Sequence, residues 1–232
     1  MSAAVGPAEL AVREALRAAM AHHDAGRLRE AEAGYREVLA SAPGRPDALA
    51  LLATLEQATG RLDDALAHVD EALRTSADAA GLHNVHGLVL EARGRTGEAE
   101  AAYRKACALA PRFAPALFNL GNLLRVQARG EEAIACYRRA LDAQPRYAAA
   151  WNNLGVALQD AGRLEEALAA YRSALEQADL AECRTNFARC AAMAPRIPAD
   201  AGFRALVGRA LAEAWVRPAD LARTAATLLA AD

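Results

Sequence analysis

The 232-residue sequence has one lysine, four phenylalanines and nine prolines, and it is poor in the aromatic residues that favour strands. Its formal net charge is −2, so it lacks the basic excess that nucleic acid or an anionic membrane would attract. No apolar stretch approaches the roughly 20 residues of a membrane span, and the N-terminus lacks the pattern of a signal peptide. We therefore expect no nucleic-acid partner, no membrane contact and a cytoplasmic location.

Sequence motifs of redox, metal-binding and catalytic sites are also missing. The cysteines Cys107, Cys136, Cys183 and Cys190 form no CxxC pair and have no histidine at zinc-finger spacing. No glycine-rich phosphate loop, GxSxG or HExxH occurs. We expect reduced thiols, no cofactor, no metal, no catalytic residue and no enzymatic activity.

Alanine is abundant, with 64 residues, and it is the strongest helix former. Four of the five tyrosines share one period. Tyr103, Tyr137 and Tyr171 are spaced by 34 residues, Tyr35 lies two such periods before Tyr103, and Val69 occupies the intervening place. A repeat of this length predicts stacked supersecondary units.

Small residues follow the same period, and they let two helices approach closely. A glycine also recurs where the chain must reverse between helices, except that repeat four has Ala128 there and we expect its glycine to move to Gly130. The columns are Ala31, Ala65, Ala99, Ala133 and Ala167; Ala19, Ala53, Gly87, Gly121 and Gly155; Pro43, Pro111 and Pro145; and, at the turn, Gly26, Gly60, Gly94 and Gly162.

The set Trp151, Leu154, Gly155, Ala167 and Tyr171 resembles the signature of the tetratricopeptide repeat (TPR), a helix-turn-helix unit. The resemblance implies an all-α fold, a right-handed α-solenoid superhelix whose first helices form a concave wall and whose second helices form a convex one. The predicted organisation is a lead-in at 1–11, repeats at 12–45, 46–79, 80–113, 114–147 and 148–181, a capping helix at 182–194 and a C-terminal helical segment at 195–232.

The C-terminal segment should contain two amphipathic helices. Pro195 and Pro198 end the repeat pattern, and Pro218 suits the first turn of the last helix. We expect these helices to pack on each other and on the capping helix. The alternative is a further domain, because the WVRP segment resembles what precedes the catalytic domain in some bacterial TPR-fused methyltransferases and glycosyltransferases.

The histidines His83 and His86 lie three residues apart on one predicted helix. A metal site is one interpretation of this spacing. Packed, neutral histidines are the favoured one, because the two residues occupy the columns of Trp151 and Leu154.

The predicted concave wall is rich in asparagine. An amide both donates and accepts, as pairing with a peptide unit requires. The series Asn119, Asn153 and Asn186 is similar to the asparagine ladder in the peptide-binding superhelix of O-linked N-acetylglucosamine transferase. The alternative is that these asparagines link neighbouring first helices. The predicted peptide-binding residues are Asn84, Glu91, Phe118, Asn119, Asn122, Arg125, Asn152, Asn153 and Gln159.

These patterns favour a non-catalytic protein-protein interaction scaffold that binds an extended peptide segment in the concave groove. A carboxylate clamp of the chaperone-tail type is not expected, because the single lysine, Lys105, lies on a second helix. Two alternatives stay open. One is the substrate-recruiting TPR region of a larger methyltransferase or glycosyltransferase, and the other is weak self-association into a TPR assembly.

Overall fold

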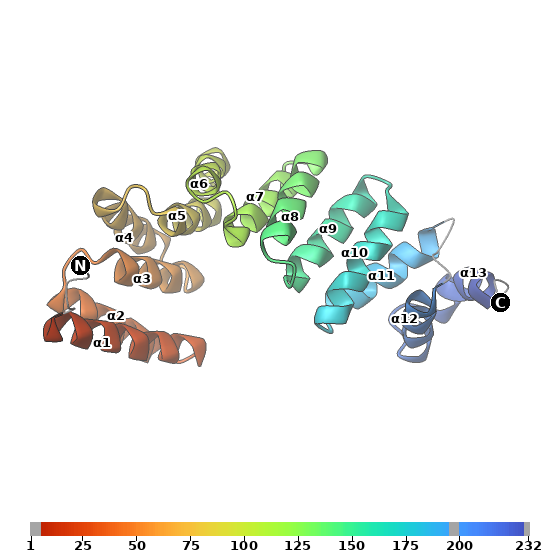
Figure 1. Cartoon of the computed structure of the whole chain (residues 1–232), viewed down its shortest axis with the longest axis horizontal. Coiled ribbons are helices and arrows are strands. Elements are labelled where there is room, and N and C mark those ends of the chain that lie inside the picture. Colours follow the sequence, from red (N-terminus) through yellow and green to blue (C-terminus); the bar gives the residue numbers. More distant parts are fainter. Residues whose placement is uncertain (1–5, 195–199, 230–232) are drawn as a thin grey trace. The chain divides into compact units, whose positions relative to one another are not determined.

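The computed structural model describes residues 6–194 and 200–229, and within these residues the chain forms helices and no strand (Figure 1). The predicted all-α solenoid of helical pairs is confirmed. The helices are α1 (Pro7–Asp24), α2 (Leu28–Ser41), α3 (Pro46–Ala58), α4 (Leu62–Thr75), α5 (Ala80–Ala92), α6 (Thr96–Leu109), α7 (Ala114–Val126), α8 (Gly130–Ala143), α9 (Ala148–Asp160), α10 (Leu164–Gln177), α11 (Ala181–Met193), α12 (Ala201–Ala212) and α13 (Pro218–Leu229).

The chain divides into two compact units, Met1–Pro111 and Arg112–Asp232, which are described separately. In unit 1, α1 packs on α2, α3 on α4, and α5 on α6, and successive pairs meet through α2 with α3 and α4 with α5. In unit 2, α7 packs on α8 and α9 on α10, while α8 contacts α9 and α10 contacts α11. Helix α7 also contacts α9, and α9 contacts α11. These three first helices therefore form one continuous surface within unit 2, here called the first-helix face.

The tyrosine column lies in the core between the two helices of each repeat. Tyr35, Tyr103, Tyr137 and Tyr171 are each 0% exposed. A Cβ atom added at Gly121 would lie 2.7 Å from Cε1 of Tyr137, and Gly87 and Gly155 show the same close approach to their tyrosines. The predicted small-residue column therefore makes room for an aromatic ring.

The two repeats that lack this glycine compensate in different ways. In repeat one the glycine is on the second helix, where a Cβ on Gly34 would lie 2.7 Å from the Cβ of Ala19. In repeat two the tyrosine is replaced by Val69, whose smaller side chain leaves space for the methyl group of Ala53.

The turn between the two helices of a repeat requires a left-handed residue. Gly26, Gly60, Gly94 and Gly162 have φ between 71° and 80°. The expected shift of this role to Gly130 in repeat four is wrong, because Gly130 begins α8 and Ala128 itself adopts φ 60°. Ala128 therefore carries a conformation that its Cβ disfavours.

The C-terminal helices pack on each other and on the capping helix, as predicted. Helix α11 contacts both α12 and α13, and the buried hydroxyl of Thr224 donates to the carbonyl of Ala191 at 2.9 Å. Asp200 caps α12 by accepting from the backbone N–H groups of Gly202 and Phe203. Pro195, Pro198 and residues 230–232 lie outside the described residues.

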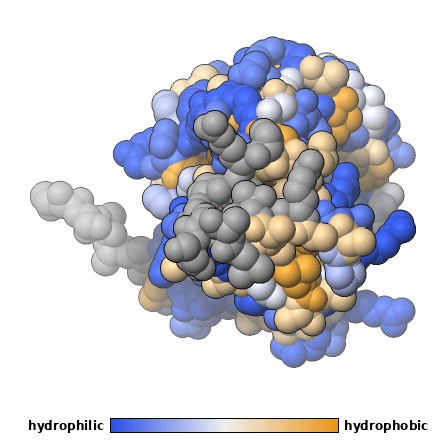
Figure 2. Space-filling model, turned by 90° about the vertical axis from the view of Figure 1, so that its right-hand side faces the viewer, coloured by the Kyte–Doolittle hydropathy of each residue, from blue (hydrophilic) through white to orange (hydrophobic). Residues whose placement is uncertain are grey.

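An aromatic cluster stabilises this end of unit 2. The ring of Phe187 lies 6.2 Å from those of Phe203 and Trp215, and the guanidinium groups of Arg184 and Arg209 lie over Trp215 at 5.9 and 5.2 Å. Seen from this end, apolar residues are interspersed with hydrophilic ones (Figure 2). Such a mixed surface suits a helix pair that closes a repeat array.

The first helix starts before the first repeat. It begins at Pro7, inside the segment 1–11 that we expected as a lead-in, because Pro7 fits the first turn of a helix. Among the described residues, no helix is both long and apolar enough to span a membrane.

Candidate functional site

The nine predicted peptide-binding residues are distributed over both units. Asn84 and Glu91 lie on α5 in unit 1, and the other seven lie on α7 and α9 in unit 2. Asn84 is only 8% exposed, which differs from the expectation of an open surface position. Glu91 accepts a 2.7 Å hydrogen bond from the hydroxyl of Tyr103, so one of its carboxylate oxygens already has a partner within the repeat.

Four asparagines in unit 2 form a continuous hydrogen-bonded series, here called the asparagine chain: Asn186, Asn152, Asn153 and Asn122. Nδ2 of Asn186 donates to Oδ1 of Asn152 at 3.2 Å, and Nδ2 of Asn152 donates to Oδ1 of Asn153 at 3.2 Å. Nδ2 of Asn153 then donates to Oδ1 of Asn122 at 2.8 Å, and the Tyr137 hydroxyl donates to the same oxygen at 2.8 Å.

The asparagine chain joins α11, α9 and α7, and the Tyr137 hydroxyl connects it to α8, so these amides link neighbouring helices. This is the alternative that the sequence left open. Asn152 is only 4% exposed and uses both ends of its amide, so it positions its neighbours instead of facing solvent. Asn122 and Asn153 are partly exposed, and each amide nitrogen has two N–H groups. Asn119 lies one turn before Asn122 on α7 and also has an interaction partner.

The remaining predicted residues of unit 2 surround the asparagine chain. The ring of Phe118 lies 4.9 Å from that of Tyr147 and 6.1 Å from that of Tyr137. Oε1 of Gln159 accepts from the Tyr171 hydroxyl at 3.0 Å, and its Nε2 lies 4.0 Å from Sδ of Met193. The first-helix face therefore combines amides with aromatic and apolar groups.

Arg125 lies against the Tyr137 hydroxyl, at the end of the asparagine chain. Burial raises the pKa of Tyr137 to about 12, while the guanidinium group of Arg125 lowers this pKa and so opposes the effect. The Nε atom of Arg125 is buried without a hydrogen-bond partner. Arg125 also lines a cavity of about 420 Å³ between the turns of repeats four and five.

Three tyrosine hydroxyl groups form hydrogen bonds to the first helices of their own repeats, at a regular spacing that was not predicted from the sequence. The residue twelve positions earlier hydrogen-bonds to the tyrosine hydroxyl in three repeats: His23 with Tyr35 at 3.1 Å, Glu91 with Tyr103 at 2.7 Å and Gln159 with Tyr171 at 3.0 Å. The signal was available, because a polar residue occurs at this spacing before each of these tyrosines. Glu91 and Gln159 therefore stabilise the repeat as well as lying on its first helix.

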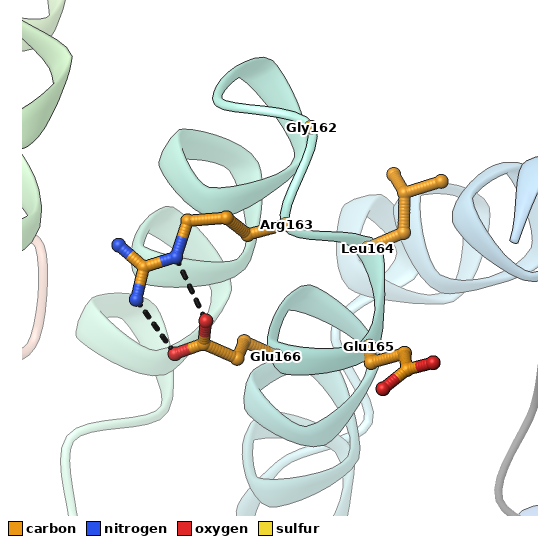
Figure 3. Close-up of a pocket in the computed structure, with 5 residues that line it drawn as sticks. All are labelled: Gly162, Arg163, Leu164, Glu165 and Glu166. Atoms are coloured by element: carbon orange, nitrogen blue, oxygen red, sulfur yellow. Dashed lines mark hydrogen bonds and ion pairs between the residues drawn. The ribbon is translucent and has the colours of Figure 1, made fainter.

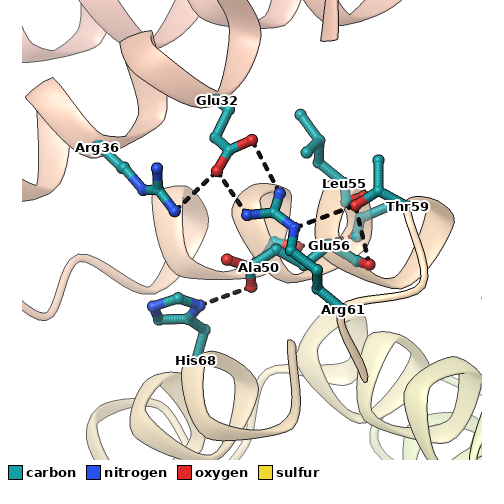
Figure 4. Close-up of polar contacts among 9 residues, drawn as sticks. Glu32, Arg36, Ala50, Leu55, Glu56, Thr59, Arg61 and His68 are labelled. Carbon is teal, nitrogen blue, oxygen red and sulfur yellow. Dashed lines mark hydrogen bonds and ion pairs between the residues drawn. The ribbon is translucent and has the colours of Figure 1, made fainter. Parts of the chain in front are cut away.

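Repeat two replaces this arrangement with an ionisable pair in which the glutamate is buried and the histidine is partly exposed. Glu56 is 0% exposed, and its Oε2 lies 2.7 Å from Nδ1 of His68, again twelve residues away (Figure 4). Its Oε1 has no hydrogen-bond partner. Repeats three to five have Leu90, Leu124 and Leu158 at the place of Glu56, so the departure from these three repeats was visible in the sequence.

A nearby ion-pair cluster links α2 to the turn of repeat two. Glu32 accepts from Arg61 at 2.7 and 2.8 Å and pairs with Arg36 at 2.7 Å (Figure 4). The hydrogen bond from Arg61 lowers the pKa of Glu32. This cluster joins consecutive repeats of unit 1, and we assign it a structural role.

The turns of later repeats have an arginine-glutamate clamp. Nε and Nη2 of Arg163 donate to the two carboxylate oxygens of Glu166 at 2.7 and 2.8 Å, beside a shallow surface cavity of about 360 Å³ (Figure 3). Arg95 with Glu98 and Arg129 with Glu132 repeat this geometry. Because each clamp uses both carboxylate oxygens, the pair stabilises the start of a second helix.

The two histidines of α5 are partly buried, as the favoured interpretation expected. A ring nitrogen of His83 lies 2.7 Å from the carbonyl oxygen of Ala77, and Nε2 of His86 lies 3.5 Å from Asp70. Burial lowers the pKa of His86, and the nearby carboxylate of Asp70 opposes this effect. Within the described residues, no group of three or more metal-ligating side chains is placed to hold an ion.

Helix pairs that repeat every 34 residues define an α-solenoid repeat protein. Tetratricopeptide-repeat family models match residues 22–87, 80–113 and 118–182, which together span more than half of the chain. The chain belongs to the tetratricopeptide-repeat family. The repeats of this family form protein-interaction scaffolds, and the chain has their architecture.

Solved TPR structures share the fold. PilF of Pseudomonas aeruginosa has a TM-score of 0.72 and 19% identity, over 80% of this chain and 85% of that chain. A thermophilic TPR protein of Thermus thermophilus has a TM-score of 0.68 and 24% identity, over 77% and 98%. YrrB, described as a TPR protein with an unusual peptide-binding site, has a TM-score of 0.54 and 21% identity, over 78% and 97%. No curated protein matches the sequence.

Proposed function

We propose that the chain is a non-catalytic scaffold whose first-helix face in unit 2, formed by α7, α9 and α11, binds an extended polypeptide segment. The observation that carries the proposal is the asparagine chain, which places partly exposed amides of Asn122 and Asn153 side by side at 2.8 Å. Amides held in fixed positions can pair with a peptide backbone whatever its side chains are. The solved structure of YrrB is described as a TPR protein with an unusual peptide-binding site, which supports peptide binding as a use of this fold.

The internal hydrogen bonds assign the predicted residues different roles. In the asparagine chain Asn122 contributes its amide oxygen and Asn153 donates through Nδ2, so N–H groups of both residues can also donate to a peptide carbonyl. Buried Asn152 is a positioning residue for Asn153. Asn119, Phe118, Arg125 and Gln159 border the same face and contact side chains of the guest. For Asn84 and Glu91 in unit 1, contact with a peptide stays a prediction.

The proposal retains the expected cytoplasmic location. Burial raises the pKa of Cys183 to about 12 and that of Cys190 to about 11, so both thiols stay protonated and unreactive. Such thiols suit a reducing compartment.

The proposal is tested with a peptide selected on the wild-type chain from a displayed random library. Replacing Asn119 and Asn153 with alanine should weaken its binding by about 1–3 kcal/mol, because donors and acceptors that pair with the guest are removed. Isothermal titration calorimetry measures the affinity, and circular dichroism verifies that the helices remain.

The matched control is Asn186→Ala, which breaks one bond of the asparagine chain at a residue outside the nine predicted peptide-binding residues. It should leave the affinity close to that of the wild type. Equal losses in the control and the double variant would mean that the asparagines act only through the fold, and this would overturn the proposal.

A further inference from the structure

The C-terminal ends of α7, α9 and α11 form a row of equivalent positions on the first-helix face of unit 2. Val126, Asp160 and Met193 are the last residues of these three helices, and we call them the helix-end row. Val126 is 75% exposed and Met193 57%, more than the other exposed large hydrophobic side chains among the described residues. Asp160 lies between them in the order of the repeats and is also exposed.

A cavity of about 420 Å³ opens beside Asp160. Its small residues come from the two turns and from the adjoining ends of α8 and α9, and they leave room for a side chain of a guest to enter. Two carboxylates and one guanidinium group complete the lining. The lining residues are Arg125, Ala128, Gly130, Glu131, Ala157, Asp160 and Ala161.

The electrostatics of the cavity favour a cationic occupant. Asp160 ends α9, where the negative end of the helix dipole disfavours a carboxylate, and α9 has no basic residue in its last turn. In residues 6–194 and 200–229 Asp160 has no ion pair, and the Glu131 carboxylate is 3.5 Å from Arg163. Arg125 lies in the last turn of α7, and its guanidinium group lies against Tyr137.

We propose that the helix-end row selects a basic side chain in the bound segment, flanked by apolar side chains about three residues away on each side. The basic group enters the cavity and pairs with Asp160, while the apolar groups contact Val126 and Met193. Packed helices lie about 8–10 Å apart and an extended chain rises about 3.3 Å per residue, so one repeat corresponds to about three residues. This inference rests on the proposed function and specifies its partner.

Three fluorescein-labelled peptide libraries of about twelve residues test the inference against the full chain. Each has leucines three positions before and after a central residue that is lysine, serine or glutamate, and small polar residues elsewhere. Fluorescence anisotropy should show roughly tenfold tighter binding of the lysine library than of the other two. The variant Asp160→Asn should remove most of this preference.

The control Asp142→Asn removes a carboxylate from α8, where Asp142 lines a separate cavity with Trp151. It should retain the wild-type preference for lysine. Equal binding of all three libraries, tighter binding of the glutamate library, or a lysine preference that survives Asp160→Asn would each overturn the inference.

The experiment also separates the inference from the function on which it rests. If all libraries bind equally and the Asn119→Ala, Asn153→Ala double variant weakens all of them, peptide binding stands and the basic preference is wrong. If no library binds the wild-type chain at micromolar concentration, both proposals are wrong.

Discussion

At the scale of single residues, Ala128 is a point of strain that repeat four retains. Its φ of 60° is disfavoured by about 1 kcal/mol for a residue with a Cβ, whereas the equivalent Gly162 has φ 74° at little steric cost. Ala128→Gly should therefore stabilise the protein by about 1 kcal/mol, less the added entropy of the unfolded chain. Urea unfolding measures the change.

The reciprocal variant, Gly162→Ala, is the control for this prediction. No heavy atom lies within 4 Å of a Cβ at Gly162, so the substitution changes only backbone strain. It should destabilise the protein by a similar amount. A destabilising Ala128→Gly together with a neutral Gly162→Ala would contradict the assignment of strain to these turns.

At the scale of helices, the approach of α7 to α8 depends on the absence of a side chain at Gly121. A methyl group there would meet the Tyr137 ring at 2.7 Å, so Gly121→Ala should cost about 1–3 kcal/mol of unfolding free energy in urea titrations. Repeat two shows a compatible combination, Ala53 opposite Val69. Adding Tyr137→Val should therefore cost less than the two single changes combined, and strict additivity would count against this packing account.

The helices and their pairing could be predicted from the sequence, because periodic small residues and tyrosines report packing within one repeat. The orientation of the asparagine side-chain amides could not be predicted from the sequence. Whether Asn152 faces solvent or Asn186 depends on how the successive first helices α9 and α11 meet, and Asn186 lies 34 residues after Asn152. Likewise, Ala128 keeps the left-handed turn because the neighbouring helices fix its backbone, against its local preference.

At the scale of the whole molecule, the proposed binding surface lies in unit 2, whereas the polar contacts of unit 1 join its own repeats. Unit 1 has the buried Glu56 with His68 and the Glu32 cluster, both within or between repeats. Unit 2 combines the asparagine chain with the exposed ends Val126 and Met193. This difference in surface chemistry is the reason for placing the guest on α7, α9 and α11.

The most direct test of this account observes the asparagine side chains themselves. NMR spectra of the 15N-labelled chain resolve side-chain amide groups, which can be assigned by single substitutions. On addition of a selected peptide, the amide signals of Asn122 and Asn153 should shift, while that of Gln177, which donates to Pro145 outside the proposed surface, should stay in place. Unchanged Asn122 and Asn153 signals at saturating peptide would contradict the central claim.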